Sequence, residues 1–97
     1  MKELLRLMKV MSNPVRVRII ASLEREPKHI YALAKELKLS YPLVHLYLES
    51  LENAGLVAGL LSAGEVDERE RKTYHVLPFE LVLTPALLTK LEENANE

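Results

Sequence analysis

The 97-residue chain contains no cysteine, no glutamine and no tryptophan. Without cysteine it can form no disulfide, no thiolate metal site and no thiol nucleophile. Its three glycines leave little room for a loop that cradles phosphate, and neither a nucleophile elbow nor a histidine–acid pair occurs. We therefore expect neither catalysis nor a cofactor. The lack of thermolabile side chains beside many charged ones is typical of a thermophilic source.

Histidine is also scarce. His29, His45 and His75 are well separated in the sequence, and none of them forms a pair at the spacing of metal ligands. No bound metal is expected.

Long hydrophobic runs are missing as well. No apolar stretch approaches the roughly 18 residues that a membrane span requires, and the charged N-terminus does not fit a secretion signal. We expect a cytoplasmic protein that has no membrane partner. A chain of 97 residues with 48% hydrophobic content supports one domain with a single core. Because so small a domain is marginally stable, a helix that pairs two copies would stabilise it.

Charge is distributed unevenly although the net charge is only −1. Residues 1–50 hold nine Lys and Arg against five acids, whereas residues 51–97 hold four against nine. This asymmetry is compatible with one face that meets phosphate and another that faces away.

Apolar residues recur at helical spacing along the first half of the chain. Asn13 and Ser40 suit helix N-caps, and each precedes a proline in a first turn. Gly55 suits the left-handed position after a helix. The pattern predicts four helices, over residues 2–11, 14–25, 29–38 and 40–53.

After Gly55 the pattern changes to short extended segments around a charged stretch, Glu65 to Lys72, which predicts a β-hairpin over residues 56–77. Phe79 to Leu83 could extend the same sheet. Thr84 and the proline after it begin a last helix, residues 85–95. The predicted fold is a single mainly α domain with a small β-hairpin, a winged helix-turn-helix domain with an added C-terminal helix.

With these elements in this order, the sequence resembles the ArsR-like winged-helix transcription regulators of prokaryotes, archaea included. The resemblance covers residues 8–77, and its pattern Leu51…Ala54-Gly55-Leu56-Val57 is shared with MarR-like and PadR-like regulators. The matching stretches are MSNPVRVRII (residues 11–20), LKLS (37–40) and VHLYLESLENAGLV (44–57).

The resemblance implies a homodimer that places two recognition helices into successive major grooves of double-stranded DNA. Metal-sensing relatives use cysteine clusters or paired histidine and acidic ligands, which this chain lacks. Family members commonly dimerise through the first and last helices. The corresponding residues are Leu4, Leu5, Met8, Leu87, Leu88 and Leu91. Alternatively, these side chains only complete the core of one chain.

The recognition helix is unusual because residues 41–52 include no Lys or Arg, the side chains that read guanine. Leu43 and Leu46 could touch thymine methyl groups, and His45 could donate to a purine. The alternative is a protein-interaction module that covers a partner with this apolar face. The family's base-reading positions map onto Tyr41, Pro42, Leu43, His45 and Leu46.

Phosphate contacts are better supplied, although each candidate could also be a solvated surface group. The candidates are Lys28, His29, Lys35, Lys38 and Ser40. The N-terminus of the fourth helix adds free N–H groups, and Arg18 could contribute. Arg16 is expected to anchor the second helix through an ion pair.

The predicted wing carries the cations Arg69, Arg71 and Lys72 among several acids. A basic wing tip would reach the minor groove of DNA. The interspersed acids favour a self-paired, solvated loop almost equally.

Overall fold

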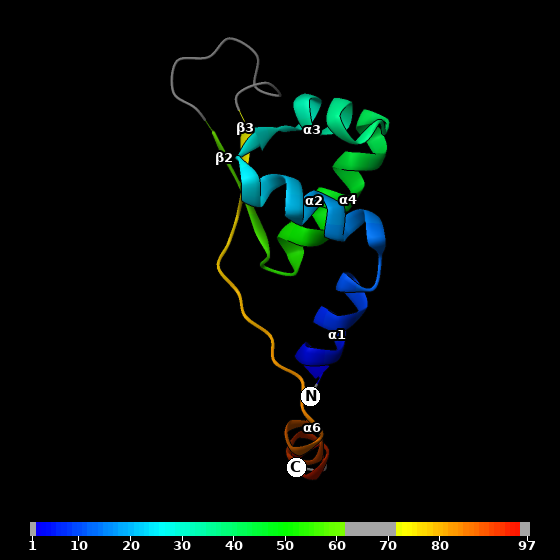
Figure 1. The fold of residues 1–97 in the computed structure, drawn as a ribbon, viewed down its shortest axis with the longest axis vertical. Coiled ribbons are helices and arrows are strands. Elements are labelled where there is room, and N and C mark those ends of the chain that lie inside the picture. Colours follow the sequence, from blue (N-terminus) through cyan, green and yellow to red (C-terminus); the bar gives the residue numbers. More distant parts are fainter. Residues whose placement is uncertain (1, 62–71, 96–97) are drawn as a thin grey trace.

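The structure is a computed structural model that describes residues 2–61 and 72–95. Helices α1 (Lys2–Met11), α2 (Pro14–Arg25), α3 (Ile30–Leu37) and α4 (Tyr41–Asn53) come first in the chain. The strands are β1 (Lys28–His29), β2 (Val57–Leu61) and β3 (Lys72–Val76), and helix α6 (Pro85–Asn94) comes last. Figure 1 shows α2, α3 and α4 packed together with the strands along one side of them. The fold is a winged helix-turn-helix, as the sequence predicts.

The helix limits follow from local capping. Asn13 Oδ1 accepts the N–H of Val15 at 2.8 Å at the start of α2, as predicted. Helix α3 begins one residue later than expected because the His29 side chain caps it, accepting the N–H of Ala32 at 3.3 Å. At the end of α4, Gly55 takes φ +76°, which only glycine adopts without steric cost.

The sheet has the order β1-β3-β2, and both pairings are antiparallel. The predicted hairpin is present, with Val57 opposite Val76 and Leu61 opposite Lys72. The sequence analysis missed β1, because two residues carry no periodicity and pair only with a strand far along the chain. The suggestion that Phe79 to Leu83 extends the sheet is wrong, since this segment is irregular and exposed beyond the end of β3.

The core lies where α2, α3 and α4 meet the sheet, and its largest fully buried side chains are aliphatic. Ser22, on the inner face of α2, is fully buried with them. The buried apolar residues are Ile19, Leu23, Ile30, Leu33, Ala34, Leu37, Val44, Leu48, Leu51, Leu56, Val57 and Tyr74. These residues pack α3 and α4 against each other in one core.

Helix α1 contacts this core along one side, through Leu7, Val10 and Met11, whereas no residue of α6 packs against it. An extended segment, residues 77–84, leads from β3 past α1 to α6 at the far end of the molecule (Figure 1). Neither α1 nor α6 contains a buried residue. The molecule measures 52 × 27 × 22 Å with a radius of gyration of 16.0 Å, whereas a compact chain of this length has about 13 Å. The chain is therefore elongated, with only Leu7, Val10 and Met11 of α1 packed on the core among the residues of its two terminal helices.

None of the helices in residues 2–61 and 72–95 has both the length and the apolar character that a membrane crossing demands.

Candidate nucleic-acid interface

The turn between α3 and α4 is set by the backbone of Lys38. Its φ of 58° and ψ of 44° place it in the left-handed region, which is uncommon for a residue with a Cβ. The N–H of Leu39 then bonds Ala34 O at 3.0 Å and closes the end of α3. The turn keeps the Lys38 side chain exposed beside the first turn of α4.

Ser40 begins α4 as predicted. Its Oγ accepts the N–H of Leu43 at 3.4 Å, and Pro42 follows in the first turn, where its missing N–H breaks no bond. Pro42 has no N–H, and the N–H of Val44 donates to Ser40 O at 3.1 Å, so in the described helix the N–H of Tyr41 remains, at the end that carries partial positive charge. The start of α4 can therefore hold an anion next to Lys38.

The faces of α4 are divided as the helical period requires. Val44, Leu48 and Leu51 are fully buried. On the opposite side Leu46 is 61% exposed and Leu43 is 37% exposed. Pro42 and His45 are exposed as well, and Tyr41 is half-buried. Four of the five expected base-reading side chains thus lie on one open surface.

Tyr41 is held in place by neighbouring rings. Its ring centroid lies 4.8 Å from that of Tyr31 on α3 and 6.1 Å from that of His45 one turn later on α4. The sequence analysis did not single out Tyr31, because an aromatic residue on the polar side of α3 has no motif around it. The three rings give the start of α4 a rigid aromatic edge.

Lys35 and Lys38 are both exposed and lie near the start of α4. Neither forms an ion pair in the part of the chain that the structure describes. They are the phosphate-contact candidates whose charge is available.

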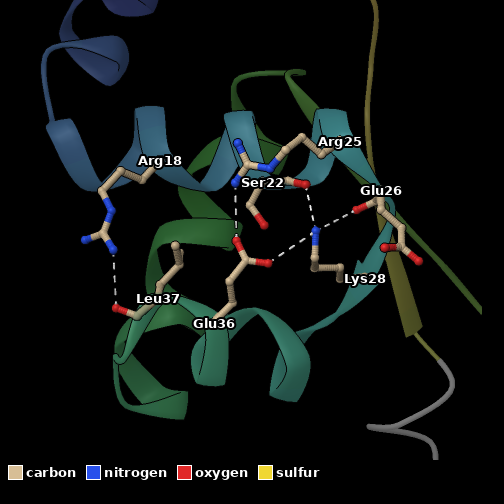
Figure 2. A network of polar contacts seen from close by, with 7 residues as sticks. All are labelled: Arg18, Ser22, Arg25, Glu26, Lys28, Glu36 and Leu37. Carbon is tan, nitrogen blue, oxygen red and sulfur yellow. Dashed lines mark hydrogen bonds and ion pairs between the residues drawn. The ribbon is translucent and has the colours of Figure 1, made fainter.

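Lys28 lies differently from what the sequence suggested. Its Nζ donates to Ser22 O at 2.7 Å and Glu26 O at 3.1 Å, and it lies 3.5 Å from Glu36 Oε1. Only 14% of the side chain is exposed. Figure 2 shows this ammonium enclosed between the end of α2 and Glu36. An ammonium with three acceptors already around it is a poor phosphate ligand, so we reassign Lys28 to holding α3 against α2.

The same network continues through the guanidinium groups of α2. Arg25 Nη2 lies 3.4 Å from Glu36 Oε2, and Arg18 reaches Leu37 O at 3.5 Å (Figure 2). The pKa of the Glu36 carboxyl is lowered by the facing Ser22 hydroxyl and by the positive charges of Lys28 and Arg25, which together outweigh the opposing effect of burial. The network fixes the tilt of α3.

Arg16 anchors α2, but within residues 2–61 and 72–95 it forms no ion pair, so the expectation of one is wrong for this part of the chain. Its Nη1 donates to Val10 O at 3.2 Å, and its guanidinium lies 5.5 Å from the centre of the Tyr47 ring. The guanidinium thus contacts the Val10 carbonyl in the last turn of α1 and the Tyr47 ring of α4 in place of a carboxylate.

His29, expected near phosphate, uses Nδ1 to cap α3. The residue is exposed, and the cap uses only one of its two ring nitrogens. The cap and a phosphate contact are therefore compatible.

The base of the wing is tied to the end of α4 by Glu52. Its Oε2 accepts the N–H of Gly59 on β2 at 3.4 Å, and its Oε1 lies 3.9 Å from Lys72 Nζ on β3. Lys72 also lies 5.3 Å from the centre of the Tyr74 ring. One carboxylate thus contacts both strands. Lys72 sits at the base of the wing, while Arg69 and Arg71 lie outside the described residues.

The expected dimer residues are all accessible in the single chain. Leu5 is 52% exposed and Leu88 is 46% exposed. Leu4, Met8, Leu87 and Leu91 are half-buried. The other side of α1, with Leu7, Val10 and Met11, packs on the core. The exposed apolar surface of Leu5 and Leu88 is therefore not needed for the core of one chain.

Residues 2–61 and 72–95 bring together no group of three or more metal-ligating side chains. The described site therefore consists of an exposed aromatic and apolar helix face, a helix N-terminus and two free lysines.

These elements define a winged helix-turn-helix protein. Helix α4 is capped and follows a three-residue turn, and Glu52 near its end contacts both strands of the β2–β3 hairpin. The profile described as "Bacterial regulatory protein, arsR family" matches residues 13–58, from the cap of α2 into β2. An uncharacterised HTH-type transcriptional regulator of Methanocaldococcus jannaschii is 38% identical over 93 residues, which are 95% of each chain. The chain belongs to the ArsR family of regulatory proteins.

A solved structure shows the same fold. An ArsR-like transcriptional regulator from Rhodococcus sp. RHA1 superposes with a TM-score of 0.68 over 98% of this chain and 75% of the other, at 23% identity. The relative from M. jannaschii comes from a thermophilic archaeon, which agrees with the composition.

Proposed function

We propose that the chain is a homodimeric transcription regulator that binds double-stranded DNA with α4 in the major groove. The observation that carries the proposal is the exposed face of α4 beside its N-terminus and two exposed cations, Lys35 and Lys38, which form no ion pair with another described residue. Phosphates would be held by the lysines and by the N–H of Tyr41 at the start of α4. The protein acts by binding, without catalysis, in the cytoplasm.

Base reading is expected to be modest. Tyr41, His45 and Leu46 offer a phenol, an imidazole and apolar surface to the groove, in place of the Arg or Asn that make bidentate contacts. DNA shape and deformability would therefore contribute much of the specificity. The wing cations Arg69 and Arg71 would add contacts to the minor groove.

The test is the salt dependence of binding to a duplex selected from random sequence. Lys35 and Lys38 in both protomers contribute four phosphate contacts and therefore about −3.6 to the log–log slope at ~0.9 per contact, to which the wing cations would add. Lys35→Ala or Lys38→Ala removes two contacts per dimer and reduces the slope by about 2. Lys90→Ala on α6 is the matched control and leaves the slope unchanged.

Failure to bind any duplex at low salt would contradict DNA binding and favour a different role for α4. The exposed Pro42, Leu43 and Leu46 would then serve a protein partner, and the chain would be a winged-helix interaction module.

Dimerisation is proposed through the exposed leucines of α1 and α6. Two copies joined there would cover Leu5 and Leu88 and give the elongated chain a second core. Sedimentation at micromolar concentration tests it: a dimer is expected, and Leu88→Glu should yield monomers. A wild-type monomer would remove the two-half-site arrangement.

A further inference from the structure

A cavity of about 500 Å³ opens between the first turns of α4 and the base of the wing. This volume is within the range of small-molecule sites, about 300–1,000 Å³. Four elements contribute to its wall. The lining residues are Ile30, Tyr41, His45, Gly59, Leu61, Lys72 and Tyr74.

The walls combine aromatic and aliphatic side chains with an equal share of polar surface. Tyr41 and His45 stack on one side, and Tyr74, only 4% exposed, lies across from the helix on β3. Ile30 is buried behind them. Gly59 permits this packing, since a Cβ there would lie 2.9 Å from a ring carbon of Tyr74. A flat, apolar body is the shape that such walls accept.

Among the described lining residues, Lys72 carries a positive charge. Lys72 supplies an ammonium, and the described lining includes no carboxylate. Glu52 lies behind Lys72 at 3.9 Å, and 38% of the lysine side chain stays exposed, so donors remain for an anion. Burial raises the pKa of the Tyr74 phenol, which keeps this group neutral in the cavity.

We propose that the cavity binds a small aromatic carboxylate, with its carboxylate on Lys72 and its ring against Tyr41 and Tyr74. The ligand would contact Tyr41 and His45, two of the side chains proposed to meet DNA bases. Ligand and DNA therefore compete, and each weakens the other's binding by the same factor. This second step rests on the proposed function, whereas the binding site itself does not.

The first experiment measures ligand binding to the full chain without DNA, by amide chemical shifts with benzoate and 2-naphthoate. We expect dissociation constants of about 1 mM or lower for ligands of this size. Benzamide, which lacks the charge, and cyclohexanecarboxylate, which lacks the ring, should bind at least several-fold more weakly. Lys72→Met should weaken benzoate binding about tenfold, while Lys72→Arg retains it and Lys90→Met leaves it unchanged.

The second experiment repeats the duplex titration with and without saturating 2-naphthoate. A loss of DNA affinity for the wild type but not for Lys72→Met supports the competition. Ligand binding with unchanged DNA affinity overturns the competition.

The remaining outcomes separate the two proposals. No binding of either aromatic carboxylate at about 50 mM, or equal binding by Lys72→Met, overturns the ligand site. If Lys72→Met weakens DNA binding but no carboxylate binds, Lys72 serves a DNA phosphate only, and the ligand site is again overturned. Ligand binding by a protein that binds no duplex overturns the proposed function and leaves the site standing.

Discussion

Replacing Lys28 separates two roles that a surface lysine in this region could have. The structure gives its ammonium two backbone carbonyls, Ser22 O at 2.7 Å and Glu26 O at 3.1 Å, besides Glu36. We expect Lys28→Met to destabilise the domain without weakening its hold on DNA. Methionine is the chosen replacement because it retains most of the aliphatic stem.

The magnitude follows from the carbonyl contacts. Hydrogen bonds to a charged group contribute about 1.5–3 kcal/mol each, but part of this is regained when water reaches the carbonyls. We therefore expect a loss of about 1.5–3 kcal/mol in the free energy of unfolding for the pair. For a domain of this size, 1 kcal/mol corresponds to about 4–8 °C in Tm.

The assay is urea unfolding followed by far-ultraviolet circular dichroism, since the chain has no tryptophan. Protein concentration must be matched, because the stability of a dimer depends on it. Lys35→Met is the control, with unchanged stability and a reduced salt slope for DNA binding. The reasoning is refuted if Lys28→Met keeps full stability and lowers the salt slope as Lys35→Met does.

Glu36, Gly59 and Lys38 each give a further prediction. Glu36 has a lowered pKa in the folded state, so its contribution to stability is complete above its unfolded pKa of about 4.5 and is lost as the pH falls through the folded value. In urea titrations, the difference in stability between wild type and Glu36→Gln should therefore vanish at low pH, and a difference that grows on acidification would contradict this. Gly59→Ala places a Cβ 2.9 Å from a ring carbon of the buried Tyr74, which cannot move aside as the neighbouring Lys72 side chain can, and should cost about 1–3 kcal/mol in unfolding experiments. Gly55→Ala is limited by its positive φ rather than by space. Lys38→Gly removes the strain of a residue with a Cβ at positive φ, so this variant should be more stable than Lys38→Ala by about 0.5–1 kcal/mol. Both variants should reduce the salt slope of DNA binding equally, and equal stabilities would mean that the turn carries no strain.

Local sequence signals predicted most of the architecture. The caps at Asn13 and Ser40 and the glycine at position 55 act within a few residues of the chain, and their hydrogen bonds and dihedral angles lie where the pattern indicates. The buried face of α4, with Val44, Leu48 and Leu51, follows from the helical period alone. Strand β1 was missed because its pairing partner lies far along the chain.

The candidate site divides in the same way. The sequence identified α4 and its unusual lack of cations, because residue types and spacing are visible there. It could not distinguish Lys28 from Lys35, since both are lysines near α3. Only the packing of α2 against α3 turns one ammonium inward onto Ser22 O and Glu36 and leaves the other in solvent.

By itself, then, the sequence determined which segments are helical, where they begin and end, and which faces are apolar, since these depend on contacts within one or two turns. The tertiary structure alone decided which charges are free, which ring supports Tyr41, how Glu52 joins the wing to α4, and where a cavity forms. These properties depend on distances between segments that are remote along the chain, and burial removes or preserves a charge according to what lies across from it.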